Sequence, residues 1–405
     1  MDKILTGVPI KKQNFSSIIL NYSLLLPPIF KRYFTFMRGK WIKIQWIAFL
    51  VAVLLAAPSF SFASESSGEE KFNAGEMIMH HIKDAHEIHI IGDFAIYLPV
   101  IVKTDEGVKL FSSSHFYHNP KELEIETSHG VKKVEYFEHD GLVLFHEKIY
   151  EAPEGLQLDE HGHPVNKAAF DLSITKNVLG LFISAFILIL LFGSAAKKYK
   201  ERKNQAPKGI QSLLEPLILF IRDEVAIPSI GEKKAEKFLP FLLTTFFFIW
   251  VSNLLGLIPF IGGFNITGTL SITAVLAAFV FIITTINGNS HYWMHILWPP
   301  NVPLPIKFIL VPIELAGIFI KPIVLMVRLT ANITAGHIII LAFTSLIFIF
   351  AQSGGPALGY GVGIGSVAFM IFMNFIELLV AFLQAYVFTL LAALYFGAAV
   401  EEAHH

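Results

Sequence analysis

The chain has 405 residues, a formal net charge of −1, 54% hydrophobic residues and no cysteine. Its mean hydropathy of +0.59 is too high for a soluble domain, and apolar segments of about 18 or more residues predict membrane spans. The lack of cysteine excludes disulfides, thiolate metal sites and cysteine nucleophiles. No segment matches the nucleotide-binding pattern G-x-x-x-x-G-K-[ST], and the balanced charge gives no indication of a nucleic-acid partner.

Residues 1–63 have the features of a secretory signal peptide whose true start is Met37. A basic segment precedes an apolar segment over residues 47–57, and the small-residue cleavage motif Ser61-Phe62-Ala63 follows. An uncleaved N-terminal span is the alternative, although the apolar segment is short for one. The chain from Ser64 onward is therefore expected to begin outside the cytoplasmic membrane. The basic residues are Arg38, Lys40 and Lys43.

Residues 64–170 are polar and contain three runs that alternate in the manner of β-strands. The runs are Glu87–Ile91, Ala95–Val102 and Val108–Phe111, with glycine and Asn-Pro between them. They predict a small, mostly β periplasmic domain.

Eleven histidines lie in this predicted domain. A zinc or copper site is one interpretation, but their spacing matches no tight ligand template. Histidines on the surface of a docking domain are the expectation, with no metal site. The histidines include His80, His81, His86 and His89.

Three apolar segments of ordinary span length follow. The first covers residues 178–196, and six basic residues directly after it predict that its end lies in the cytoplasm, in agreement with a secreted N-terminus. Residues 210–224 predict a helix at the membrane interface. Residues 238–260 and 268–286 predict the second and third spans. The six basic residues are Lys197, Lys198, Lys200, Arg202, Lys203 and Lys208.

The last hundred residues contain two apolar runs that are too long for upright spans. The first covers residues 308–351, and the second continues to Val400 after a predicted Gly-rich turn at residues 354–365. The first run would be roughly 65 Å long as a helix, against a bilayer core of about 30 Å. The predicted fold class is therefore an all-α polytopic membrane protein with about five membrane helices, preceded by the small β domain. The last two helices are long, strongly tilted and packed as a hairpin.

Charged residues inside the first long run are costly and are therefore candidates for function. Glu314, Lys321 and Arg328 are seven residues apart, so they follow one side of the helix, and Asn332 lies one turn beyond Arg328. Arg328 is about 20 residues from either end of its run and cannot lose its proton, so it requires an anion. The only buried carboxylate expected near it in this chain is Glu377.

Two further polar residues lie one on each helix of the predicted hairpin. His337 is nine residues after Arg328, close to the opposite side of the first helix, and Gln384 shares a face of the second helix with Glu377. Several of these residues also have purely structural interpretations. Lys321 could extend to the membrane surface, with Glu314 as its ion-pair partner, and the amide and imidazole side chains could join helices by hydrogen bonds.

The segment Lys321-Pro322…Val327-Arg328-Leu329-Thr330-Ala331-Asn332…Ala335-Gly336-His337 resembles the signature of subunit a of F-type ATP synthases. Three further features agree with this resemblance: the motif Asn253-Leu-Leu-Gly-Leu-Ile-Pro259, Glu314, and Glu377…Gln384-Ala385. The similarity covers about residues 170–400. His80-His81 also resembles a short element that precedes the first span in this family.

The resemblance implies a non-catalytic stator subunit that conducts protons and carries no cofactor. Arg328 matches an essential arginine that faces a ring of c subunits, and Glu314 matches an acid of the cytoplasmic half-channel. Asn253 and Lys321 are expected to be structural residues near the path. The periplasmic half-channel is expected to contain Asn332, His337, Glu377 and Gln384.

The resemblance also implies partners and a location. The partners are the c-ring, the peripheral-stalk b subunits, the remaining ATP synthase subunits and the lipid bilayer. The chain is expected to cross the bacterial inner membrane several times, with a cytoplasmic C-terminus.

One departure from the family pattern leads to a specific prediction. In some members a glutamate occupies the position of His337 and a histidine occupies that of Glu377. Because either order can relay a proton, we expect His337 and Glu377 to contact each other, directly or through one water.

Two other classes of protein fit the composition less well. An autonomous secondary ion transporter would show inverted repeats, and no internal repeat is visible. An intramembrane hydrolase would need a paired nucleophile or an H-E-x-x-H helix, and neither is present.

Overall fold

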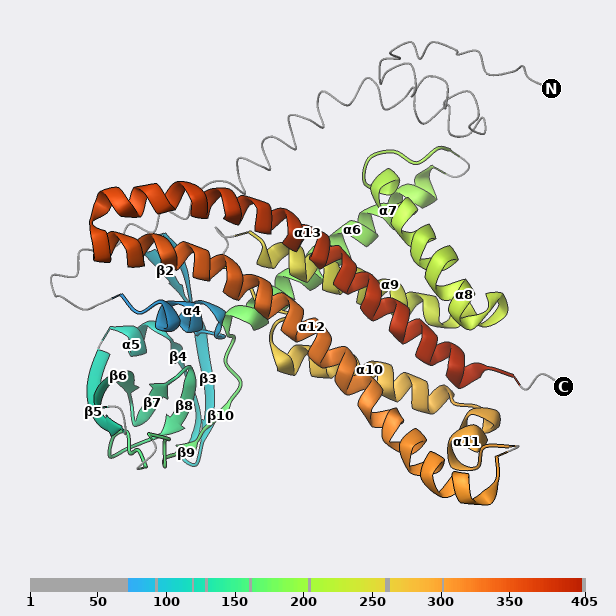
Figure 1. Ribbon diagram of the computed structural model, residues 1–405, viewed down its shortest axis with the longest axis horizontal. Coiled ribbons are helices and arrows are strands. Elements are labelled where there is room, and N and C mark those ends of the chain that lie inside the picture. The colour runs from blue at the N-terminus through green and yellow to red at the C-terminus, as the bar shows by residue number, and fades with distance from the viewer. Residues whose placement is uncertain are drawn as a thin grey trace, which may run out of the picture. The chain divides into compact units, whose positions relative to one another are not determined.

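A computed structural model of the chain describes residues 72–91, 94–118, 120–127, 130–159, 162–202, 205–258, 263–300 and 302–402. The predicted signal peptide, residues 1–63, and Pro259 of the second-span motif lie outside these residues. A β-rich domain is followed by five helices that are long and apolar enough to cross a membrane, as predicted (Figure 1).

The β-rich domain contains three antiparallel sheets with the strand orders β1-β2, β10-β3-β4 and β5-β6-β7-β8-β9. The valines of β3 and the leucines of β7 alternate inward and form its main core with Ile149 of β8 and Phe116. The strands are β1 Glu87–Ile91, β2 Phe94–Tyr97, β3 Pro99–Thr104, β4 Gly107–Ser112, β5 Pro120–Thr127, β6 Gly130–His139, β7 Leu142–Phe145, β8 Lys148–Glu151, β9 Lys167–Ala168 and β10 Phe170–Asp171, with the helices α4 Ala74–Ile82 and α5 Ser114–Tyr117.

The predicted single strand Ala95–Val102 is wrong, because the chain leaves the strand ladder at Leu98. The Leu98 amide donates to the His86 carbonyl at 3.1 Å, and the Leu98 carbonyl accepts from the Ser113 amide at 2.9 Å. These bonds divide the run into β2, which pairs with β1, and β3, which pairs with β4.

The three ordinary spans are α6 Lys176–Glu201, α9 Glu232–Gly256 and α10 Leu270–Asn287. The expected interfacial helix is longer than predicted: α7 Ile210–Phe220 continues through a π-helical turn, η1 Ile221–Ala226, into α8 Ile227–Ile230. A short helix, α11 Ser290–Leu297, follows α10.

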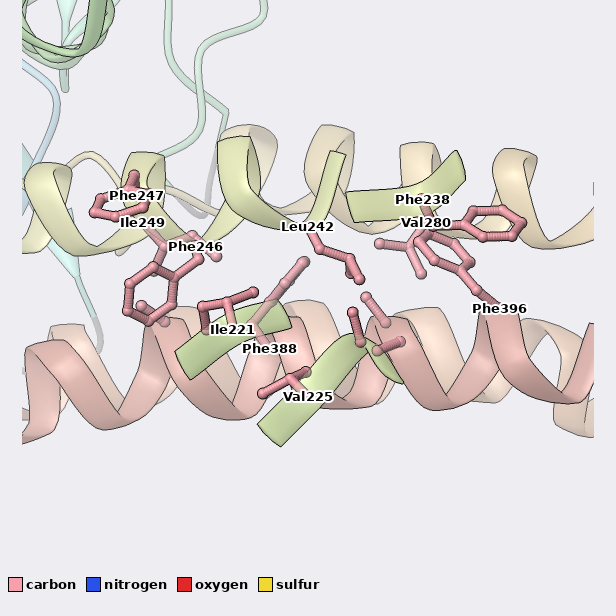
Figure 2. Close-up of a cluster of buried hydrophobic side chains, with 14 of the residues drawn as sticks. Ile221, Val225, Phe238, Leu242, Phe246, Phe247, Ile249, Val280, Phe388 and Phe396 are labelled. Carbon is pink, nitrogen blue, oxygen red and sulfur yellow. The ribbon is translucent and has the colours of Figure 1, made fainter. Parts of the chain in front are cut away.

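Phenylalanine side chains fill the contact between α9, η1, α10 and the last helix. Figure 2 shows Phe246 and Leu242 of α9 directed at Phe388 of the last helix and at Ile221 and Val225 of η1. All five side chains are at most 2% exposed. Burial of an aromatic or aliphatic side chain stabilises by about 1.5–3 kcal/mol in water. In a bilayer the same contacts act mainly through close packing. This cluster therefore fixes the last helix against α9.

The last two helices are α12 Leu304–Gly354 and α13 Pro356–Val400, which lie side by side as the predicted hairpin (Figure 1). With 51 residues, α12 is roughly 76 Å long, more than twice the bilayer core of about 30 Å. Pro312 and Pro322 lie inside α12 without ending it. A helix of this length fits a bilayer only when it is strongly tilted.

The predicted Gly-rich turn at residues 354–365 is wrong in extent. Only Gly355, with φ of 82°, separates the helices, and α13 begins at Pro356. Gly359 lies inside α13, where an added Cβ would be 2.7 Å from the Cβ of Ala351 in α12. Gly359 therefore allows the two helix backbones to approach each other instead of forming part of a loop.

Candidate functional site

Arg328 lies on an outward face of α12. Its side chain is exposed, as are those of Val324 and Val327, whereas Leu325 and Leu329 are each 1% exposed and pack inward. Within the described parts of the chain it makes no hydrogen bond or ion pair, so the pairing with Glu377 is not found. The buried leucines set the rotation of the helix and thereby keep the arginine on its exposed face.

Glu377 occupies the space left by a glycine on the facing helix. It is 5% exposed, and a Cβ at Gly336 would lie 3.0 Å from its Cδ and still nearer to its Oε1. Its Oε2 is buried and has no hydrogen-bond partner among the described residues. A buried carboxyl oxygen without a protein partner is unusual and is a natural position for a bound water.

His337 is next to Gly336 in sequence, but its ring is directed at α9. The Nε2 atom lies 3.5 Å from the position of a Cβ at Gly256. No hydrogen bond joins His337 to Glu377 in the described region, so a direct contact is not observed. The water-bridged contact remains a prediction, supported by the packing of Glu377 against Gly336.

Asn253 joins α9 to α13 beside Glu377. Its Nδ2 donates to the carbonyl of Ala381 at 3.3 Å, and its Oδ1 accepts from the Thr267 hydroxyl. Ala381 is one helical turn after Glu377 and three residues before Gln384, which is 7% exposed. Asn253 therefore connects α9 to α13 next to the buried polar face of α13.

Asn332 is exposed on α12 one turn after Arg328 and has no described partner. A neighbouring pair was not predicted: the hydroxyls of Thr273 in α10 and Thr330 in α12 are 2.6 Å apart. Threonine in an apolar run gives little sequence signal, because its hydroxyl commonly bonds to its own helix.

Lys321 lies about two helical turns before Arg328 on α12 and lines a cavity of about 30 Å³. A space of this size can hold a water molecule. The Lys321 ammonium is 5.9 Å from the centre of the Tyr395 ring, and no ion pair to Glu314 is found in the described structure. The other polar lining residues, which were not predicted, are Thr284, Thr285, Tyr292 and Tyr395.

Glu314 is partly buried on α12 and acts electrostatically on Tyr292 of α11. Burial and this carboxylate raise the pKa of the Tyr292 phenol. Glu314 therefore lies in the same region as the cavity that Tyr292 and Lys321 line. The sequence could not indicate that neighbourhood, because Tyr292 lies 22 residues before Glu314 and only the fold of the segment between them brings the two close.

The expectation of surface histidines is wrong for His86, which is 1% exposed. Its Nε2 is 3.3 Å from Oδ2 of Asp171, and its Nδ1 is 3.8 Å from Oε2 of Glu147. Although burial opposes the charged imidazole, the two carboxylates raise the pKa of His86 to about 9. In the described residues no group of three or more His, Asp or Glu side chains is placed to hold a metal ion.

Comparison with known proteins adds an independent line of evidence. Residues 178–397 match the family described as ATP synthase A chain, and residues 77–172 match a domain of unknown function, DUF8433. The chain is 43% identical over 251 residues to ATP synthase subunit a of Chloroherpeton thalassium, covering 60% of this chain and 72% of the relative.

Two other relatives give similar matches. ATP synthase subunit a 2 of Chlorobaculum tepidum is 45% identical over 239 residues, which is 57% of this chain and 64% of the relative. ATP synthase subunit a of Anaeromyxobacter sp. is 37% identical over 263 residues, 62% of this chain and 61% of the relative. Because the family match covers more than half of the chain and contains the long hairpin with Arg328, Glu377 and Gln384, the chain belongs to the ATP synthase A chain family.

Proposed function

We propose that this chain is the proton-translocating stator subunit of a rotary ATP synthase and is itself non-catalytic. The observation that carries the proposal is Arg328, a permanent cation that is exposed on an apolar helix and unpaired within the described residues. An arginine at the centre of a membrane helix costs about 2.5–3.5 kcal/mol on insertion scales. A carboxylate on a neighbouring molecule would offset that cost. Family membership disfavours the alternative of an autonomous transporter.

The partner that fits this face is a ring of c subunits, each with a carboxylate that passes Arg328 during rotation. The fixed charge would favour release of the proton from an approaching carboxylic acid into the adjacent half of the path, and would hold the carboxylate that results. It would also repel a proton that moved directly past it, because Arg328 cannot become neutral. Ion flow would then require rotation of the ring.

The outer half of the proton path contains His337, Glu377 and Gln384, with Asn332 beside Arg328. The partner-free Oε2 of Glu377 supports this assignment, because a water there could receive a proton and pass it on. Asn253 holds the backbone of α13 next to Glu377.

The inner half of the path contains Glu314 and the cavity beside Lys321. The cavity supports the assignment because it offers space for water between α10, α12 and α13. Lys321 has a structural role there, with its charge directed over the Tyr395 ring.

This assignment places the chain in the bacterial inner membrane as a multi-pass subunit. Residues 64–170 form the periplasmic domain, the membrane domain covers residues 171–405, and the C-terminus is cytoplasmic. The further partners are the peripheral-stalk b subunits, the remaining ATP synthase subunits and the lipid bilayer.

The test is ATP-driven acidification of inverted membrane vesicles that contain the complex with Arg328→Ala. We expect pumping to be lost while the complex still assembles and retains ATPase activity. Arg222→Ala is the control, because the Arg222 side chain is exposed in η1 and pairs with Asp223 at 2.7 Å. Pumping by Arg328→Ala at the level of Arg222→Ala would contradict the proposal.

A further inference from the structure

The first residue of α6 is a buried cation. Lys176 is 6% exposed, and its Nζ donates to the carbonyl of His81 at 3.3 Å. No carboxylate of the described residues lies within ion-pair distance of it. A cation at the first turn of a helix also faces the positive end of the helix dipole. Burial, the missing counter-ion and the position at the start of the helix each raise the free energy of the charged Lys176 side chain. A functional role would explain a lysine at this position.

Residues of the β-rich domain form hydrogen bonds to the first residues of α6 and to Thr175 just before it. Asp84, which follows α4, accepts hydrogen bonds from the Thr175 hydroxyl at 2.8 Å and from the Asn177 amide at 2.9 Å. The Ala85 carbonyl accepts from the Lys176 amide at 2.9 Å. These groups satisfy amides at the start of α6 that a helix leaves free. We name Asp84, Ala85, Lys176 and Asn177 the joint.

A line of polar side chains leads from the joint toward Glu377. The Asn177 side chain bonds to the Asn265 amide at 2.9 Å and to the Thr269 hydroxyl at 2.8 Å. Two residues after Asn265, the Thr267 hydroxyl bonds to Asn253, which bonds to Ala381 of α13. The buried Oδ1 of Asn265 has no partner among the described residues, which marks a second position suited to water.

Apolar packing holds the same surfaces together. Ile88 and Leu98 of the β-rich domain form one cluster with Leu255, Phe264 and Ile266 beside the path. Phe264 lies against both α6 and α9, because a Cβ at Gly180 would be 2.9 Å from its ring and a Cβ at Gly256 would be 2.6 Å from its carbonyl oxygen. The domain is therefore packed directly against the outer part of the membrane helices.

We infer that the β-rich domain forms the outer entrance of the proton path, and that Asp84 and Lys176 are positioning residues whose opposite charges tune proton uptake there. This inference rests on the proposed function. The charged and titratable groups around Lys176 are Asp84 after α4, Glu147 between β7 and β8, and His337 of α12. Glu377 of α13 packs against Gly336, the residue before His337.

Opposite charges give opposite shifts. The Lys176 cation weakens proton binding by the neighbouring titratable groups. Lys176→Met should therefore allow proton uptake at a lower proton concentration, that is, at a higher pH. The Asp84 carboxylate favours proton binding, so Asp84→Asn should move uptake to lower pH. A charge at about 4–6 Å shifts a titration by about 1–3 units, so we expect shifts of about half a unit at the greater distances here.

The experiment measures ATP synthesis in inverted vesicles that contain the complete complex. The luminal pH, which corresponds to the outer side, is varied at constant external pH and constant membrane potential. The pH of half-maximal rate should rise in Lys176→Met and fall in Asp84→Asn. It should stay unchanged in Lys176→Arg, which keeps the charge, and in Lys103→Met, which removes an exposed cation from β3.

A smaller amount of assembled complex lowers the rate of ATP synthesis but does not change the half-maximal pH. If Asp84 and Lys176 had only a structural role, their substitution would therefore lower the rate and leave the half-maximal pH unchanged. Asp84→Asn retains an acceptor oxygen for Thr175 and is the decisive variant if Lys176→Met fails to assemble. An unchanged half-maximal pH in Asp84→Asn, or shifts of both variants in the same direction, would overturn the inference. Arg328→Ala, measured in parallel, tests the proposed function separately, because it should abolish synthesis at every pH.

Discussion

At the scale of single residues, the space for a carboxyl group depends on a missing side chain. Gly336 has no Cβ, and the carboxyl group of Glu377 occupies the volume that a Cβ would fill. Glycine in the middle of a helix costs about 1 kcal/mol relative to alanine. The glycine provides the space that the buried Glu377 carboxyl group occupies.

We predict that Gly336→Ala reduces ATP-driven pumping at least several-fold without preventing assembly. The new Cβ would lie 3.0 Å from Cδ of Glu377, so the carboxyl group must move away from the path. The measurement is the initial rate of vesicle acidification, normalised to the amount of assembled complex.

Gly317→Ala is a matched control on the same helix, because nothing lies within 4 Å of the Cβ position at Gly317. This variant should pump like the unmodified complex. Equal rates in the two variants would show that the position of the Glu377 carboxyl group is not critical.

The second prediction at this scale concerns the pH dependence of the β-rich domain. His86 has an ordinary pKa of 6.5 that is raised to about 9 in the folded chain. Its stabilisation is therefore complete below about pH 6.5 and is lost as the pH rises through about 9. The shift corresponds to roughly 3 kcal/mol.

Limited proteolysis of the domain in the intact complex should therefore accelerate between pH 6.5 and pH 9. His86→Phe should remove most of this dependence by giving a high rate at both pH values. His163→Gln, which changes an exposed histidine, should keep the original dependence. Equal resistance of the unmodified domain at both pH values would contradict the role of the His86 ion pairs.

Some of the proposed site residues are evident from the sequence and others are not, for identifiable reasons. Arg328, Glu377 and Gln384 are evident because each interrupts a long apolar run. Lys176 and Asn177 were not identified because they lie at the end of a span, where polar residues are ordinary. The burial of His86 was missed because its partner Asp171 is 85 residues away in the chain, a contact that only the tertiary structure brings about.

At the scale of elements, the long hairpin was predicted from length alone, whereas its turn was not. Apolar runs of 44 and about 35 residues exceed a bilayer thickness, and no polar break divides them. The glycines after Gly354 were read as a loop because glycine is common in turns. In a membrane, however, glycine also permits close helix packing, and here only Gly355 has the positive φ that a turn requires.

We predict that Gly359→Ala destabilises the hairpin by about 1–3 kcal/mol through overpacking. The added Cβ would lie 3.0 Å from Cα of Ala351, so the two helix backbones must separate. Thermal unfolding of the purified chain in detergent measures the effect.

Gly361→Ala is the control in the same helix, because its Cβ position has no neighbour within 4 Å. This variant should unfold at the same temperature as the unmodified chain or slightly above it. If Gly359→Ala were equally stable, the close approach of α12 and α13 would not be a feature of the folded protein.

At the scale of the whole molecule, two parts with different sequence character are joined at the start of the first span. The family match to ATP synthase A chain covers the membrane helices, while a separate match covers residues 77–172. Asp84, Lys176 and Asn177 connect the two parts by hydrogen bonds. This connection is the basis for assigning the β-rich domain a role in proton entry.

The outward face of α12 has no partner among the described residues, although it carries the costliest charge of the chain. Val324 and Val327 are 44% and 48% exposed on this face, next to Arg328. The central claim is that a rotating ring covers this face.

Disulfide cross-linking tests that claim most directly, because the chain contains no cysteine of its own. A single cysteine is placed at Val324 or Val327, with another beside the carboxylate of the ring subunit, and oxidation is followed by gel analysis and ATP-driven pumping. We predict that both positions cross-link and that cross-linking stops pumping until the disulfide is reduced. Leu325→Cys, 1% exposed on the inner face, should not cross-link. Cross-linking of Leu325→Cys with none at the two valine positions would contradict the account.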